Sequence, residues 1–110
     1  MKLPYREHAT VPLAKLTDYL LSTTHSAGKS KAQFFAALGF NTTNAAHLEQ
    51  QLMIIAATED VAEIVQSPYG TKYVIRGILQ TADGRQVAII TVWIIESGQD
   101  QPRFVTAYPA

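Results

Sequence analysis

The stretch 71–96, TKYVIRGILQTADGRQVAIITVWIIE, decides the fold, because two alternating apolar runs flank the pair Asp83-Gly84. An Asp-Gly pair in this setting is a strong signal for a two-residue β-hairpin turn, since both residues tolerate positive φ. A tight turn then sets the pairing of the two strands. The resulting pairs are Thr81 with Gln86, Leu79 with Ala88, Arg76 with Thr91, and Val74 with Trp93.

This pairing sorts the two strands into an apolar and a mixed face, because side chains alternate across a sheet. The apolar face, expected to pack against helices, carries Tyr73, Ile75, Leu79, Ala88, Ile90, Val92 and Ile94. The other face carries Lys72, Val74, Arg76, Ile78, Val87, Ile89, Thr91, Trp93 and Ile95. Such a mixed face is either an ordinary solvated surface or a binding surface with two cations beside the single tryptophan.

Outside this hairpin, the second half of the chain keeps the alternating period and the first half has a helical period. Strands are expected near 61–67, 71–81, 86–96 and 103–108, separated by turn residues. Three helices are expected, which start at Pro12, at the cap Ser30 and after 41–44. The apolar stripe of the first is Leu13, Leu16, Tyr19 and Leu20. The stripe of the second is Phe34, Phe35 and Leu38, and that of the third is Ala45, Leu48, Leu52 and Ile55. Gly39 followed by Phe40 is typical of a helix C-terminus.

The predicted fold class is therefore α+β, with three N-terminal helices packed on one face of a four-stranded antiparallel meander sheet. A chain of 110 residues fits a single domain. Within it we expect an extended lead-in (1–11), a helical part (12–58) and an antiparallel sheet (59–109).

Composition restricts the function classes. The formal net charge is zero, so the chain lacks the overall attraction to nucleic acid that a basic domain has, and any phosphate site must be a local cluster. It has no cysteine, no His-Glu-x-x-His pattern and no Gly-x-Ser-x-Gly, so we expect neither metal nor cofactor, and no serine hydrolase. No stretch resembles a signal peptide or a membrane span, which predicts a cytoplasmic protein without a membrane partner.

His25 is the candidate acid or base. It stands in a Ser/Thr/Gly-rich loop before the second helix, with Lys29 in the loop and Lys31 in the first helical turn. Helix N-termini favour anions, and histidine exchanges protons near neutral pH. A capping loop with solvated lysines is the alternative, since no glycine-rich phosphate loop matches. His8 and His47 are expected to have ordinary surface or packing roles.

The last strand can present either of two alternating sets of side chains to the mixed face. These are Phe104, Thr106 and Tyr108, or else Arg103, Val105 and Ala107. The first set is favoured, because Thr106 and Tyr108 would extend the polar group around Arg76 and Trp93.

Several segments also carry a family resemblance: Leu16-Thr17-Asp18-Tyr19-Leu20-Leu21, His25, Gly28, Lys31-Ala32, Phe34-Phe35, Leu38-Gly39-Phe40, Pro68-Tyr69-Gly70-Thr71-Lys72-Tyr73, Asp83-Gly84-Arg85, Thr91-Val92-Trp93 and Arg103-Phe104-Val105-Thr106-Ala107-Tyr108-Pro109. Together they resemble a family of small bacterial domains similar to the C-terminal toxin modules of polymorphic and contact-dependent inhibition systems. Helices followed by a four-stranded sheet are similar to the barnase, EndoU, colicin and RelE group of metal-independent ribonucleases.

The resemblance implies a ribonuclease-like domain acting on RNA. The catalytic candidates are His25, Lys31, Arg76, Arg103 and Thr106, and the substrate-binding candidates are Lys72, Trp93 and Tyr108. The alternative is a non-catalytic module whose mixed sheet face binds a protein partner of the immunity or antitoxin kind, or a second copy of the chain.

Overall fold

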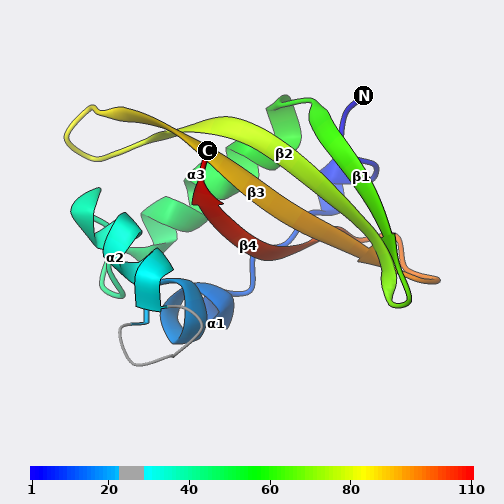
Figure 1. The fold of residues 1–110 in the computed structure, drawn as a ribbon, viewed down its shortest axis with the longest axis horizontal. Helices are drawn as coiled ribbons and strands as arrows, with labels where there is room; N and C mark the ends of the chain where they lie inside the picture. The colour runs from blue at the N-terminus through cyan, green and yellow to red at the C-terminus, as the bar shows by residue number, and fades with distance from the viewer. Residues whose placement is uncertain (23–28) are drawn as a thin grey trace.

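The computed structural model describes residues 1–22 and 29–110 and shows the predicted α+β fold, with the helices before the strands. Four strands form an antiparallel sheet in the order β1-β2-β3-β4. They are β1 (Val61–Ser67), β2 (Gly70–Gln80), β3 (Gln86–Glu96) and β4 (Arg103–Pro109). Figure 1 shows α3 (Ala45–Thr58) lying across one face of this meander, which we call the inner face. The opposite face is the outer face.

The first predicted helix is broken into two short pieces. One turn of α-helix, α1 (Leu13–Lys15), continues as the π-helical turn η2 (Leu16–Leu20). The Leu21 N–H donates to the Leu16 carbonyl at 2.7 Å, five residues back, as in a π-turn. Leu16 and Leu20 are buried as expected, whereas Leu13 is 54% exposed and lies outside the core.

The second helix, α2 (Lys29–Ala37), ends as its sequence predicts. Gly39 adopts φ 89°, and the Phe40 N–H donates to the Phe35 carbonyl at 2.9 Å. This bond closes a Schellman motif, in which a left-handed glycine lets the chain turn back and satisfy helix-end carbonyls. Phe35 and Phe40 are both buried, so the turn also returns the chain to the core.

The segment 1–11 is more ordered than the extended lead-in that we predicted. It contains a 3₁₀ turn, η1 (Arg6–His8), and Leu3 is fully buried. Thr10 lies alongside the start of β4, where its N–H donates to the Pro102 carbonyl and its carbonyl accepts from the Phe104 N–H, both at 2.9 Å. The segment therefore adds to the core and covers part of the β4 edge.

The β2–β3 turn has three residues, not two, and the predicted register is wrong by one. The Thr81 N–H donates to the Arg85 carbonyl at 3.0 Å, and the Gly84 N–H donates to the Thr81 carbonyl at 3.1 Å. Gly84 has φ 85°, the left-handed residue of a three-residue hairpin loop. Gln80 therefore pairs with Gln86. Further along the ladder, Val74 pairs with Val92 and Tyr73 with Trp93.

The shift exchanges the two faces of β3. On β2, Ile75 and Leu79 are buried on the inner face as predicted. On β3, however, the inner residues are Ile89, Thr91 and Trp93, and the outer residues are Ala88, Ile90, Val92 and Ile94. Trp93 was predicted on the mixed face, but it is fully buried in the core.

The buried polar groups of β3 are satisfied within the sheet. The Trp93 Nε1–H donates to Thr91 Oγ1 at 2.9 Å, and the Thr91 hydroxyl donates to the Ile75 carbonyl at 2.9 Å. Burying a hydroxyl or an indole N–H is costly unless it is hydrogen-bonded. This relay allows both side chains to lie in the core.

Gly77 of β2 sets how closely α3 approaches the sheet. A Cβ built at this position would lie 2.8 Å from two side-chain carbons of Ile55, which is buried on α3. The absence of a side chain here lets the helix pack directly on the backbone of the strand.

Because Trp93 is the single tryptophan, the register can be tested by fluorescence. We expect blue-shifted emission and little quenching by acrylamide, since water does not reach the indole. Adding RNA should leave the emission unchanged. Emission typical of a solvated indole, or strong quenching by RNA, would place Trp93 on the outer face and would contradict the observed register.

The turn residue Asp83 should make stability depend on pH. Hydrogen bonds from the Thr81 hydroxyl and from Arg85 lower the pKa of Asp83 from 3.8 to about 2. A carboxyl with a lowered folded-state pKa stabilises the fold above its usual pKa, and this contribution disappears as pH falls through the folded value. Asp83→Asn should therefore lower the Tm at pH 7, and the difference from wild type should shrink between pH 4 and pH 2. Asp100→Asn, in the exposed β3–β4 loop, is the control. An Asp83→Asn deficit that is constant with pH would contradict this role.

Candidate functional site

The outer face places charged, hydroxyl and apolar residues in successive rows. Because strand pairs bring their partners side by side, one row is Lys72, Ile94 and Arg103, the next is Val74, Val92 and Thr106, and the third is Arg76, Ile90 and Tyr108. Five predicted site residues thus share this face: Lys72, Arg76, Arg103, Thr106 and Tyr108. Basic side chains lie in the first and third of these rows, and β3 contributes an apolar residue to each row.

A β-bulge in β4 makes this grouping possible. Phe104 pairs with Trp93 and Thr106 with Val92, so Val105 is the extra residue between them. A bulge breaks the alternation of a strand. Arg103 and Thr106 can then point to the same face, while Phe104 and Ala107 are buried. Neither of the two sets considered for the last strand is therefore correct as a whole.

At the β4 edge, the helical layer brings two lysines to this surface. The Tyr19 hydroxyl lies 3.3 Å from Thr106 Oγ1, within hydrogen-bond distance. The ammonium groups of Lys15 and Lys31 lie 5.2 and 6.0 Å from the centre of the Tyr19 ring. Such distances allow cation–π attraction. We call Lys15, Tyr19, Lys31 and Thr106 the Tyr19 cluster.

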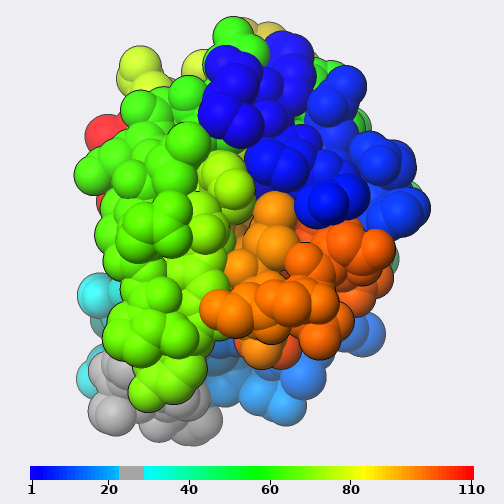
Figure 2. All heavy atoms as spheres, turned by 90° about the vertical axis from the view of Figure 1, so that its right-hand side faces the viewer, coloured from blue at the N-terminus to red at the C-terminus, as the bar shows by residue number. Residues whose placement is uncertain are grey.

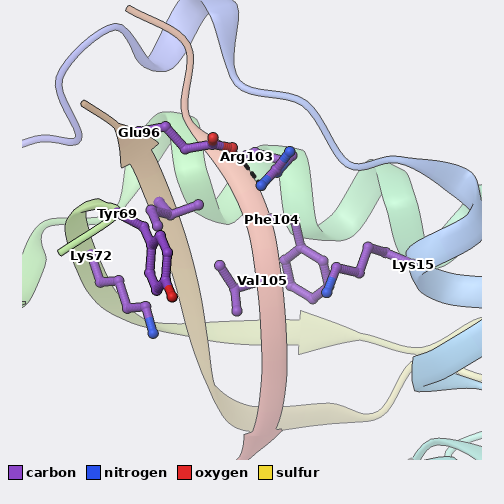
Figure 3. Close-up of a pocket in the computed structure, with 8 residues that line it drawn as sticks. Lys15, Tyr69, Lys72, Glu96, Arg103, Phe104 and Val105 are labelled. Atoms are coloured by element: carbon purple, nitrogen blue, oxygen red, sulfur yellow. Dashed lines mark ion pairs between the residues drawn. The ribbon is translucent and has the colours of Figure 1, made fainter. Parts of the chain in front are cut away.

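A pocket of about 310 Å³ lies next to this cluster. It is lined by Lys15, Tyr69, Lys72, Ile94, Glu96, Arg103, Phe104 and Val105. Figure 3 shows the Glu96–Arg103 pair at one end, with Tyr69 and Lys72 on one side and Lys15 on the other. We call it the Arg103 pocket. Lys15 belongs to both features and therefore connects the pocket to the Tyr19 cluster.

The pocket combines an ion pair with an apolar floor. Arg103 Nη2 lies 2.5 Å from Glu96 Oε1, and both side chains are about half exposed. Ile94 is only 7% exposed although it lies on the outer face, because it forms the floor between Lys72 and Arg103. Figure 2 shows the green end of the β1–β2 hairpin beside the orange β3–β4 segment on this side of the molecule. A smaller cavity of about 160 Å³, lined also by Gln99 and Gln101, adjoins the same ion pair.

The structure therefore brings together most, but not all, of the residues predicted for the site. Lys31 and Thr106 meet in the Tyr19 cluster, and Lys72 and Arg103 line the pocket. Arg76 and Tyr108 lie further along the outer face, flanking Ile90. Trp93 has no ring face open to a ligand. His25 lies outside the described residues.

The sequence reasoning missed four residues of this surface: Lys15, Tyr19, Tyr69 and Glu96. Lys15 and Tyr19 are four residues apart, a spacing that brings helical side chains together, so this pair could have been found. Tyr69 is 76% exposed in the β1–β2 turn, where an aromatic side chain has no core to fill. Nothing in the sequence pairs Glu96 with Arg103, because that contact depends on the β3–β4 register.

Metal ligands do not cluster in the part of the chain that the structure describes, where no three His, Asp or Glu side chains gather. Among the described helices, none is long and apolar enough to cross a membrane.

Comparisons with known proteins identify a solved structure of similar fold and, separately, the family of the chain. No curated protein matches the chain. A solved structure titled as a contact-dependent growth inhibition toxin–immunity protein complex from Klebsiella pneumoniae 342 contains a similar chain, with a TM-score of 0.70 and 14% sequence identity. The similarity covers 96% of each chain. At this identity it establishes a shared fold. A family model matches residues 2–110, and the chain therefore belongs to DUF6883, a family described as a domain of unknown function.

Proposed function

We propose that this chain is a metal-independent, ribonuclease-like domain of the toxin type, which binds RNA across the Tyr19 cluster and the Arg103 pocket. The observation that carries the proposal is the position of Lys15, which flanks the Tyr19 ring together with Lys31 and also lines the pocket with Lys72 and Arg103. The chain has no net charge, so attraction to phosphate must come from a local group of cations such as this one. Phosphate groups are the natural ligands of clustered lysines and arginines.

In this proposal the Tyr19 cluster holds the scissile phosphate. Lys15 and Lys31 flank the Tyr19 ring, and the hydroxyls of Tyr19 and Thr106 lie together between the helical layer and β4. Two cations and two hydroxyl groups can stabilise the negative charge that develops on the phosphate as the ribose 2′-hydroxyl attacks. They supply this stabilisation without a metal ion.

His25 is the proposed general acid or base. The segment that carries it connects η2, which bears Tyr19, to α2, which bears Lys31. Both flanking elements thus contribute a side chain to the cluster. A base or acid in this segment would act on the ribose hydroxyl or the leaving oxygen.

The shared fold supports this proposal at the level of architecture. The similar chain comes from a complex of a growth-inhibition toxin with its immunity protein. We infer that the present chain is related to such systems and could have a protein partner of the immunity kind.

A second candidate function has its own observation. Apolar side chains lie along β3 on the outer face, and Ile78 of β2, one row beyond Arg76, is 48% exposed. Ile90 and Val92 are half-buried on the same face. A contiguous apolar surface bordered by charges is typical of a protein interface. A non-catalytic module could therefore use this face to bind a protein or a second copy of the chain.

Cleavage of single-stranded RNA in the presence of EDTA tests the first function. His25→Ala should reduce the cleavage rate about 10²–10⁴-fold, the usual contribution of acid–base catalysis, and leave the Tm nearly unchanged. His8→Ala is the matched control, because His8 is exposed on η1, which contributes no residue to the site. Cleavage that requires Mg²⁺, or that survives His25→Ala, would contradict the proposed chemistry.

RNA binding provides a second measurement. Lys31→Gln should weaken binding, and it should make the slope of log K against log salt less steep by about 0.7, the value for one phosphate contact on a single strand. Arg6→Gln removes an exposed cation from η1 and should leave the slope unchanged. No binding to RNA, together with a concentration-dependent dimer, would favour the interaction module.

A further inference from the structure

We propose that the Arg103 pocket is a base-recognition site that takes a guanine of the RNA. This inference rests on the proposed function, because it assumes that the phosphate next to the base lies in the Tyr19 cluster. It assigns a ligand to the part of the surface that phosphate binding does not explain, namely an aromatic ring, an apolar floor and a carboxylate.

The carboxylate is the first argument. Glu96 lines the pocket together with three cations, Lys15, Lys72 and Arg103. A site for phosphate alone gains nothing from a carboxylate, which repels the ligand. A carboxylate is useful where a ligand has N–H donors. Each carboxylate oxygen has two lone-pair sites, so Oε1, which lies 2.5 Å from Arg103 Nη2, and Oε2 can both accept from a ligand.

The hydrogen-bonding pattern favours guanine. Guanine has two adjacent donors, N1–H and N2–H, which match a carboxylate, and two acceptors, O6 and N7, which match a guanidinium. Glu96 and Arg103 present these two groups side by side. Adenine, cytosine and uracil each have fewer donors for Glu96 or fewer acceptors for Arg103. Guanine is therefore the base that uses the most of this pair.

The shape of the pocket fits an unstacked base. Tyr69 is 76% exposed at its rim, and Ile94, Phe104 and Val105 provide apolar surface. Proteins that read single-stranded RNA stack bases on such exposed aromatic rings and read their edges with polar side chains. The volume of about 310 Å³ accommodates a purine. Lys15, shared with the Tyr19 cluster, would then lie between the base and the phosphate.

Binding of the four nucleoside 3′-monophosphates, measured by calorimetry or NMR titration, tests the inference without requiring cleavage. GMP should bind roughly tenfold or more tightly than AMP, CMP and UMP, the usual discrimination by one good bidentate contact. Glu96→Gln should remove this preference, and Glu63→Gln, an exposed carboxylate on β1 outside the pocket, should retain it. Tyr69→Ala should weaken all four nucleotides by a similar factor, since stacking is tolerant of base identity.

The outcomes separate this inference from the proposed function. A guanine preference that depends on Glu96 supports the pocket even if the chain cleaves no RNA. Equal affinity for the four nucleotides, or a preference that survives Glu96→Gln, overturns it even if the chain is a ribonuclease. NMR shift changes confined to residues far from Tyr69 and Arg103 would also overturn it.

Discussion

The hydrogen bonds of the 81–85 turn control the rest of the sheet. Gly84 is left-handed and Thr81 pairs with Arg85, so the loop has three residues and odd-numbered residues of β2 lie opposite odd-numbered residues of β3. A shift of one residue would move every side chain of β3 to the other face. It would expose Trp93 and bury Ile90 against the helices. The local chemistry of one turn thus decides what the core contains and what the outer face offers to a ligand.

The bulge at Val105 is a second local irregularity, and it determines which β4 side chains share the outer face. Regular alternation would separate Arg103 from Thr106 on opposite faces of β4. With one extra residue, Phe104 still packs edge-on against Trp93, at a centroid distance of 5.4 Å, while Arg103 and Thr106 share the outer face. The bulged strand therefore places Phe104 and Ala107 in the core and Arg103 and Thr106 on the outer face, which a regular strand of this sequence could not do.

The strands were predictable because their signals are local. Alternating residues and turn residues placed β1 and β3 at their observed bounds, and β2 within one residue of them. The register was not predictable, because Asp83-Gly84 suits both two- and three-residue loops, and burial of the tryptophan decides between them. The candidate site also has a part that local signals predicted and a part that they did not. Lys72 and Arg76 lie on the predicted face, since β2 did not shift. Contacts between helix and sheet, such as Tyr19 with Thr106, depend on tertiary packing that no spacing reveals.

The charges of the outer face also constrain what can cover it. Its apolar rows along β3 are bordered by Lys72, Arg76 and Arg103, and of these Arg103 has an ion-pair partner among the described residues. Burying a cation without a partner is costly. A protein that covers Ile90 and Val92 would therefore need carboxylates opposite Lys72 and Arg76. Phosphates meet the same requirement, so RNA and an acidic protein surface would compete for this face. Binding of such a partner would block access to the Arg103 pocket by occupying the cations that any nucleic acid needs.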